Sequence, residues 1–300
     1  MTLDRGRFSR RWPPLAGAIS AVAAALAVPV LADYEPTAPY VPTVEEDVEL
    51  MLDVAEVCPD DYVIDLGSGD GRIAIAAARR GARALGIEIE PDLVELSRRN
   101  ARDAGVEDLA AFVEGDLFEA DISAASVVTL YLFPEVNIAL RPKLLAELTP
   151  GTRVVSNSFD MGDWVPDVHD KSARSSGGIL MWIVPARVAG DWRLEIDGAE
   201  SYVLSIDQRY QQIEVRLGAP DGEPREGSAP PVSEPGSARL HADRIVFRAA
   251  TADRTYAFSG TVDGDVIRGD VRVRGEDGER RLRWRAASIE PRAANRARIR

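Results

Sequence analysis

The stretch Val63–Arg80 constrains the fold more than any other part of the sequence. Its first residues, Val63-Ile64-Asp65-Leu66, form an apolar run of the kind that makes a buried parallel strand. Three glycines spaced by two follow it, with Ser68 after the first: Gly67, Gly69 and Gly71. Glycines allow a sharp turn and a close approach to a ligand, and a helix that starts there directs its N-terminal amides at that ligand. The stretch therefore predicts a strand, a ligand-binding loop and a helix.

The spacing of the glycines distinguishes between ligands. A dinucleotide-binding loop reads G-x-G-x-x-G and holds phosphates at the helix N-terminus. Here the third glycine comes one residue earlier, and Asp65 stands two residues before the first. This order resembles the first motif of class I S-adenosylmethionine (SAM) methyltransferases, D/E-x-G-x-G-x-G, whose ligand carries a sulfonium and an amino-acid head. We expect SAM at Asp65, Gly67, Ser68, Gly69 and Gly71; an NAD site or a bare tight turn are the alternatives.

Strands and helices alternate over residues 33–185, which predicts a doubly wound, Rossmann-like α/β domain with a mainly parallel sheet. Later strands are expected at 84–87, 110–113, 126–132 and 152–156, with helices at 91–104 and 137–147. Segments 164–169 and 179–184 are expected to form an antiparallel hairpin. Thr43-Val44-Glu45-Glu46 fits a capping box that starts a helix over 44–57.

From residue 186 to 290 apolar residues alternate with period two, which predicts an antiparallel β domain. Seven or eight strands are expected, closing into a small barrel or sandwich. Turns are expected at Asp263-Gly264 and at Glu276-Asp277-Gly278. Segment 218–237 carries five prolines and many acidic residues and is expected to be a disordered loop. Residues 291–300 are expected to be a tail.

Residues 1–32 are typical of a signal peptide or an N-terminal anchor. Arginines precede a small-residue apolar run over 15–28, and Val30-Leu31-Ala32 ends it. We therefore expect an exported protein, periplasmic or membrane-anchored facing the periplasm, associated with the membrane or envelope. The net charge of -13 argues against nucleic acid as a partner. One cysteine and two distant histidines predict no metal site.

Further candidate residues follow the later strands. Glu88 ends the second strand about twenty residues after the loop, where an acidic side chain can accept both ribose hydroxyls; the alternative is a solvated strand end. Asp116 follows the third strand, where class I methyltransferases typically place an acid on the adenine amino group; the alternative is a helix N-cap. The fourth and fifth strands end in the substrate-side candidates Tyr131, Asn157 and Asp160. Core packing or turn formation are the alternatives for these, and Asp160 is the first candidate for a base.

A closer resemblance rests on three segments: Tyr40-Val41-Pro42-Thr43, Asp65–Arg72 and Asp116-Leu117-Phe118. They resemble the mitochondrial protein-lysine methyltransferase group, whose members act on the c-ring protein of ATP synthase and on the adenine nucleotide translocator, and its bacterial relatives. The resemblance covers residues 39–185. It implies that Tyr40 and Thr43 lie beside SAM, and that Leu117 joins Asp116 in the cofactor site. The β-rich C-terminal region has no counterpart in the mitochondrial members.

The expected function is therefore a SAM-dependent methyltransferase acting on a protein, such as a protein lysine, or on a small molecule. The alternative is a non-catalytic envelope protein whose methyltransferase fold binds a nucleoside-like ligand while its β domain docks a partner. The predicted export supports this alternative, because SAM is made in the cytoplasm.

Overall fold

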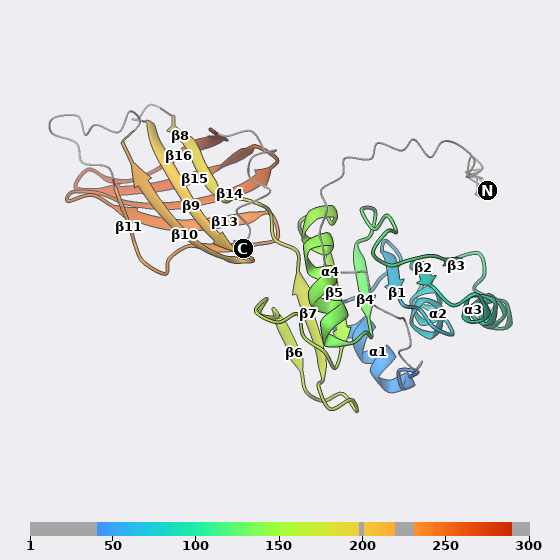
Figure 1. Cartoon of the computed structure of the whole chain (residues 1–300). Helices are drawn as coiled ribbons and strands as arrows, with labels where there is room; N and C mark the ends of the chain where they lie inside the picture. Colours follow the sequence, from blue (N-terminus) through green and yellow to red (C-terminus); the bar gives the residue numbers. More distant parts are fainter. Residues whose placement is uncertain (1–40, 198–200, 220–230, 290–300) are drawn as a thin grey trace, which may run out of the picture. The chain divides into compact units, whose positions relative to one another are not determined.

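A computed structural model describes residues 41–197, 201–219 and 231–289, and the chain from Val41 onward forms one compact unit. The expected signal or anchor at 1–32, the candidate Tyr40 and the tail at 291–300 lie outside the described residues. Two β-sheets organise the described part, one seven-stranded and one nine-stranded (Figure 1). The Rossmann-like part and the β domain are both present; the domain boundaries stay a prediction.

The first sheet has the order β3-β2-β1-β4-β5-β7-β6. Its strands are β1 (Tyr62–Leu66), β2 (Arg83–Glu88), β3 (Ala110–Glu114), β4 (Val127–Leu130), β5 (Arg153–Asn157), β6 (Val168–Asp170) and β7 (Ile179–Ile183). Strands β1 to β5 are parallel, whereas β7 pairs antiparallel with both β5 and β6. The order reverses beside β1, which pairs with β2 on one side and β4 on the other. Open α/β sheets bind ligands at such a switch point, outside the carboxyl ends of the strands.

Helices cover both faces of this sheet. They are α1 (Glu45–Val54), α2 (Arg72–Arg79), α3 (Pro91–Asp103) and α4 (Pro134–Glu147). Residues of α1, α2 and α3 share one hydrophobic core with inward residues of the sheet, and α4 shares the core on the opposite face. In the described residues, no helix has both the length and the apolar character needed to cross a membrane.

Two helix starts differ from the prediction. The capping box at Thr43 is wrong: α1 begins at Glu45, its N-cap is Val44, and no side chain caps it. Thr43 is instead buried. Helix α4 begins at Pro134, before the expected position, because proline is well suited to the first turn of a helix.

The second sheet is antiparallel throughout, in the order β10-β9-β8-β16-β15-β14-β13-β11, with β12 paired to β13. Its strands are β8 (Gly190–Ile196), β9 (Ser201–Arg209), β10 (Gln212–Gly218), β11 (Val232–Ser233), β12 (Arg239–His241), β13 (Arg244–Ala250), β14 (Thr255–Asp263), β15 (Val266–Gly275) and β16 (Gly278–Ser288). Asp263 pairs with Val266, and Gly275 with Gly278, so the two predicted turns are confirmed.

The nine strands, against the expected seven or eight, form a nearly closed barrel. The Ser233 hydroxyl donates to the Val215 carbonyl, which joins β11 to β10 at the two ends of the strand order. Large apolar side chains pack together in the core of this domain, among them Trp192, Phe247 and Trp284. Strand β11 lies within the segment expected to be a disordered loop, and residues 220–230 of that segment lie outside the described residues.

Candidate cofactor and acceptor site

The glycine loop joins β1 to α2 in a backbone conformation that favours glycine. Gly67, Gly69 and Gly71 have φ of 74°, 54° and 83°, in the left-handed region. A Cβ on Gly67 would lie 2.7 Å from Leu132 Cδ2, and one on Gly71 would lie 2.7 Å from two carbons of the Phe112 ring. The loop therefore needs glycine both for its backbone angles and for its packing.

The amides of the loop are used to hold its own shape. The N–H groups of Gly67 and Ser68 donate to the Ile87 carbonyl at 2.9 and 3.0 Å. The Gly69 N–H donates to Glu88 Oε2 at 2.8 Å, and the Gly71 N–H to the Ser68 carbonyl at 2.9 Å. A pyrophosphate needs free N–H donors. These four N–H groups are therefore not available to a pyrophosphate; the first amides of α2 are not among them.

Asp65 provides a buried carboxyl group with one oxygen that has no donor among the described residues. Asp65 is 2% exposed, and its Oδ1 accepts a hydrogen bond from Thr129 Oγ1 at 2.7 Å. Among the described residues nothing donates to Oδ2, and the buried Ser68 Oγ is also unpartnered. Burial raises the pKa of Asp65 to about 7, and the nearby charges of Glu88 and Asp70 act in the same direction. An unpaired buried acceptor is costly unless a ligand satisfies it, so the loop fits a ligand with a cationic donor such as the amino group of SAM.

Glu88 ends β2 beside the loop and is held by the backbone. Oε1 accepts from the N–H groups of Ile89 and Glu90 at 2.8 and 3.1 Å, and Oε2 accepts from Gly69. A carboxylate has about four acceptor positions, so about one is left for a ribose hydroxyl. Glu88 lies where a ribose ligand was predicted, but a second hydroxyl would have to share an acceptor position.

Thr43 is connected to the loop through Arg72. The Arg72 side chain donates from Nη1 to the Thr43 carbonyl at 2.5 Å, and from Nε and Nη2 to the Asp70 carboxylate at 2.9 and 2.6 Å. The segment before α1 is thereby held against the glycine loop. The role of Thr43 beside SAM stays a prediction.

Asp116 and Leu117 follow β3. The exposed Asp116 accepts from the Phe118 N–H through Oδ1 at 2.8 Å, and its carbonyl accepts from Glu119 and Ala120. Asp116 thus holds a turn, and no helix begins there, so it is not the helix N-cap of the alternative interpretation. Its role toward adenine stays a prediction. Leu117 packs against the core on the α4 face of the sheet.

The candidates on the acceptor side lie after β4 and β5. The rings of Tyr131 and Phe159 stack with centroids 6.3 Å apart, and Phe133 lies 6.4 Å from Phe159. Asn157 is buried, and its Oδ1 accepts from Ser158 Oγ at 3.1 Å. The exposed Asp160 accepts from the Gly162 N–H at 2.9 Å through Oδ1. The structure brings the aromatic side chains together and places Asp160 in an adjacent turn; the catalytic roles stay predictions.

Asn137 is a residue of this region that the sequence reasoning missed. It is fully buried on α4, and its Nδ2 lies within hydrogen-bond distance of the carbonyls of Phe159 (3.2 Å) and Asp160 (3.4 Å). Its Oδ1 has no donor among the described residues. The sequence signal for Asn137 is a single amide side chain among the apolar residues on the buried face of a helix.

A mainly parallel sheet with this glycine loop after β1 and a buried carboxylate near the end of β1 defines a Rossmann-like SAM-dependent methyltransferase. The ANTKMT methyltransferase domain matches residues 65–168. A protein-lysine N-methyltransferase of Saccharolobus islandicus is 48% identical over 135 residues, which cover 44% of this chain and 84% of that protein. The chain therefore belongs to the same family of methyltransferases as this relative, and SAM is its cofactor.

Two other relatives extend the comparison. The adenine nucleotide translocase lysine N-methyltransferase of Mus musculus is 40% identical over 129 residues, which cover 43% of this chain and 56% of that protein. The chain thus matches little more than half of the length of this relative. A solved RNA methyltransferase of Salinibacter ruber, in complex with S-adenosyl-L-homocysteine, is 55% identical with a TM-score of 0.47, covering 49% of this chain and 96% of that chain.

Proposed function

We propose that this enzyme methylates the ε-amino group of a lysine in a protein. The observation that carries the proposal is the extent of the family match, residues 65–168, which includes both the glycine loop and the acceptor-side residues Tyr131, Asn157 and Asp160. Two relatives named lysine N-methyltransferases are similar over 135 and 129 residues.

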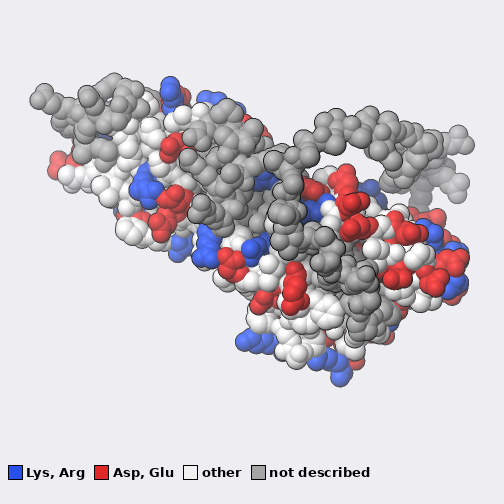
Figure 2. All heavy atoms as spheres, viewed as in Figure 1, with Lys and Arg blue, Asp and Glu red and all other residues white. Residues whose placement is uncertain are grey.

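The charge of the methyltransferase part supports a cationic acceptor. Residues 41–185 contain 27 acidic and 12 basic side chains, and acidic groups are prominent on the face that Figure 2 shows. A field of this sign attracts a lysine-rich segment and repels a polyphosphate backbone. It therefore favours protein over RNA as the acceptor.

The residues of the site have separable roles in this reaction. Asp65 and Ser68 offer acceptors to the amino-acid head of the cofactor, and Glu88 offers one to its ribose. Bound SAM supplies an electrophilic methyl group on a sulfonium, which leaves as a neutral thioether. Tyr131 and Phe159 provide an apolar wall, and removing water there lowers the pKa of a lysine ammonium. We assign the removal of its proton to the Asp160 carboxylate.

The direct test is to locate the transferred methyl group. The full chain is incubated with tritium-labelled SAM and a lysate of cells that lack its gene, and the protein, RNA and small-molecule fractions are counted. We expect label in protein, released as methyllysine on acid hydrolysis, and none with an Asp65→Ala variant. Label confined to RNA or to small molecules would overturn the proposal.

A second experiment tests Asp160 alone. The Asp160→Asn variant keeps the side-chain oxygen that accepts from Gly162 but loses basicity. A lost general base lowers kcat about 100-fold or more, whereas SAM affinity should stay within about twofold. Equal losses of turnover and SAM affinity would count against the assignment.

A further inference from the structure

We propose that the turn between β9 and β10 of the β domain positions the acceptor-side loop of the enzyme, defined here as Phe159–Val165. The β domain would then be a working part of the active site. The inference rests on the proposed position of the acceptor after β4 and β5, and does not depend on lysine being the acceptor.

The turn consists of Tyr210 and Gln211, and Tyr210 is buried in the core of the methyltransferase part. Tyr210 is 5% exposed and has φ of 55°, an uncommon conformation for a residue with a Cβ. Its ring stacks on Trp164, with centroids 5.7 Å apart and planes at 18°. Both belong to the same core cluster as Trp182 of β7. The turn is thus packed into the core and is more than a surface contact.

Gln211 fixes the end of the acceptor-side loop by two hydrogen bonds. The indole N–H of Trp164 donates to Gln211 Oε1 at 3.0 Å, and Gln211 Nε2 donates to the Val165 carbonyl at 2.7 Å. One amide side chain therefore sets both the orientation of the buried indole and the path of the backbone after it.

The Asp163 carboxylate accepts hydrogen bonds from both domains. Its carboxylate accepts from Arg209 Nη2 at 2.6 Å, from the Tyr210 hydroxyl at 2.8 Å and from Arg141 Nη1. Arg141 Nη1 on α4 also donates to the Met161 carbonyl at 2.7 Å. The hydrogen bond from Arg209, followed by that from Tyr210, holds the pKa of Asp163 well below its usual range.

These contacts leave Asp160 between two points of attachment. On one side, Asn137 of α4 holds the carbonyls of Phe159 and Asp160. On the other, the turn and its neighbours hold Asp163 and the residues that follow it. Because Asp160 lies only three residues from Asp163, we expect loss of the contacts from the turn to loosen the backbone that carries the candidate base. Arg141 and Trp182 still hold this loop, at the Met161 and Trp164 carbonyls. None of the contacts named above involves the cofactor loop.

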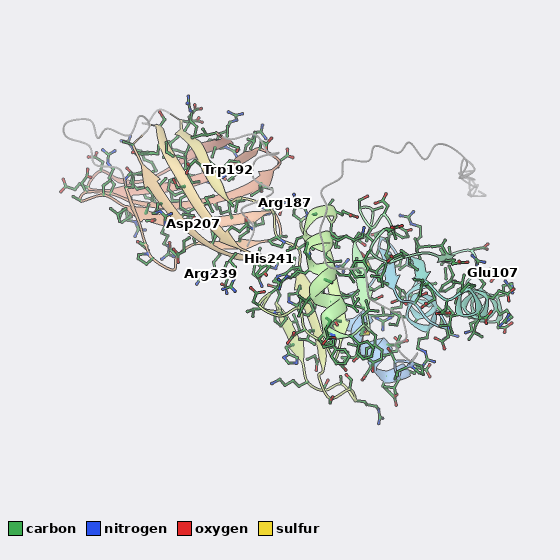
Figure 3. All side chains as sticks on the ribbon, viewed as in Figure 1. Glu107, Arg187, Trp192, Asp207, Arg239 and His241 are labelled. Carbon is green, nitrogen blue, oxygen red and sulfur yellow. The ribbon has the colours of Figure 1, made fainter. Side chains whose placement is uncertain are left out.

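The alternative is that the same contacts only hold the two domains together. Hydrogen exchange separates the two interpretations without an identified acceptor. We compare the full chain with the Arg209→Ala/Gln211→Ala double variant, which leaves the Tyr210 ring in the core. The matched control is Arg216→Ala, which removes an ion pair to Asp207 on the same two strands; Figure 3 labels Asp207 on this sheet.

We expect amides 160–165 to exchange at least about fivefold faster in the double variant and at the unaltered rate in the control. SAM affinity, measured by calorimetry, should stay within about twofold in both. Tritium transfer to lysate protein should fall at least about fivefold in the double variant alone. The proposal would be overturned if the double variant were less stable but its amides 160–165 exchanged at an unchanged rate. It would also be overturned if SAM affinity fell in parallel with methyl transfer. Absence of protein labelling by the unaltered enzyme would contradict the proposed function, while the exchange result would still decide this one.

Discussion

Binding of the cofactor should depend on pH through a single buried carboxyl group. The pKa of Asp65 is raised to about 7 by burial, and its Oδ2 has no donor among the described residues. A cationic amino group binds the ionised form of this carboxyl. At pH 6 about a tenth of Asp65 is ionised, and at pH 7.5 about three quarters, if its pKa is 7. The dissociation constant should therefore be roughly eightfold higher at pH 6 than at pH 7.5.

Calorimetric titration with S-adenosylhomocysteine at pH 6, 6.5, 7 and 7.5 measures this change. The control ligand is 5′-methylthioadenosine, which keeps the thioether and the nucleoside but has no amino-acid head. Its affinity should vary by less than about twofold over the same range. Repeating the titration at pH 6.5 in buffers of different ionisation enthalpy should also show that a proton is released on binding.

Few other groups could produce the same pH dependence. The chain contains only two histidines. His169 lies on β6 and His241 on β12, away from the glycine loop in the chain and in the strand order. An Asp65→Asn variant should bind more weakly and without dependence on pH. A constant affinity for S-adenosylhomocysteine between pH 6 and 7.5 would refute the argument that Asp65 binds its amino group.

Three further predictions concern the stability of the protein and its export. Without ligand, Asp65→Asn should stabilise the folded protein. A pKa that is raised in the folded state contributes stability that is fully present below the unfolded pKa of about 3.9 and is lost as the pH rises through 7. Relative to low pH, the buried Asp65 carboxyl therefore costs about 4 kcal/mol of folding stability at pH 8 and about 1.5 kcal/mol at pH 5. Melting temperatures of the two proteins should thus differ more at pH 8 than at pH 5, and the reverse order would contradict the pKa of Asp65. In urea unfolding, Gly71→Ala should destabilise the protein by about 1–3 kcal/mol more than Gly105→Ala. Both glycines have positive φ, but a Cβ added at Gly71 would clash with Phe112, whereas a Cβ added at Gly105 would meet no described atom within 4 Å. Residues 1–32 should direct a fused reporter out of the cytoplasm, and a reporter that stays in the cytoplasm would remove the basis for predicting export.

The cofactor half of the site was predictable because its signals are local in the sequence. The apolar run of β1, the glycines after it and the acid after β2 lie within 26 residues, and their chemistry requires those residue types at that spacing. Helix α1 shows the limit of such reasoning. Thr43 has the side chain of an N-cap, yet its carbonyl is held by Arg72, which is 29 residues away. The sequence near Thr43 gives no sign of this tertiary contact.

The acceptor half was harder to predict because its partners are distant in the chain. Tyr131, Asn157 and Asp160 were placed by the rule that substrates bind at the carboxyl edge of the sheet, and the structure puts them at the ends of β4 and β5. Asn137 was missed, since a buried asparagine on a helix gives no sign of which carbonyl it will meet. Trp192 and Trp284 lie in the core of the β domain, whereas Tyr210 is buried in the core of the other domain.

This division between the two halves limits what can be carried over from relatives. The family match ends at residue 168, so it covers the cofactor loop and one of the two attachments of the acceptor-side loop. The second attachment comes from Arg209, Tyr210 and Gln211, which lie beyond the match. Two enzymes can therefore share the residues that bind SAM and still present a different surface to the acceptor. If the β9–β10 turn positions Asp160 as proposed, the acceptor of this enzyme is selected in part by a domain that lies outside the matched segment, and it has to be identified on the full chain.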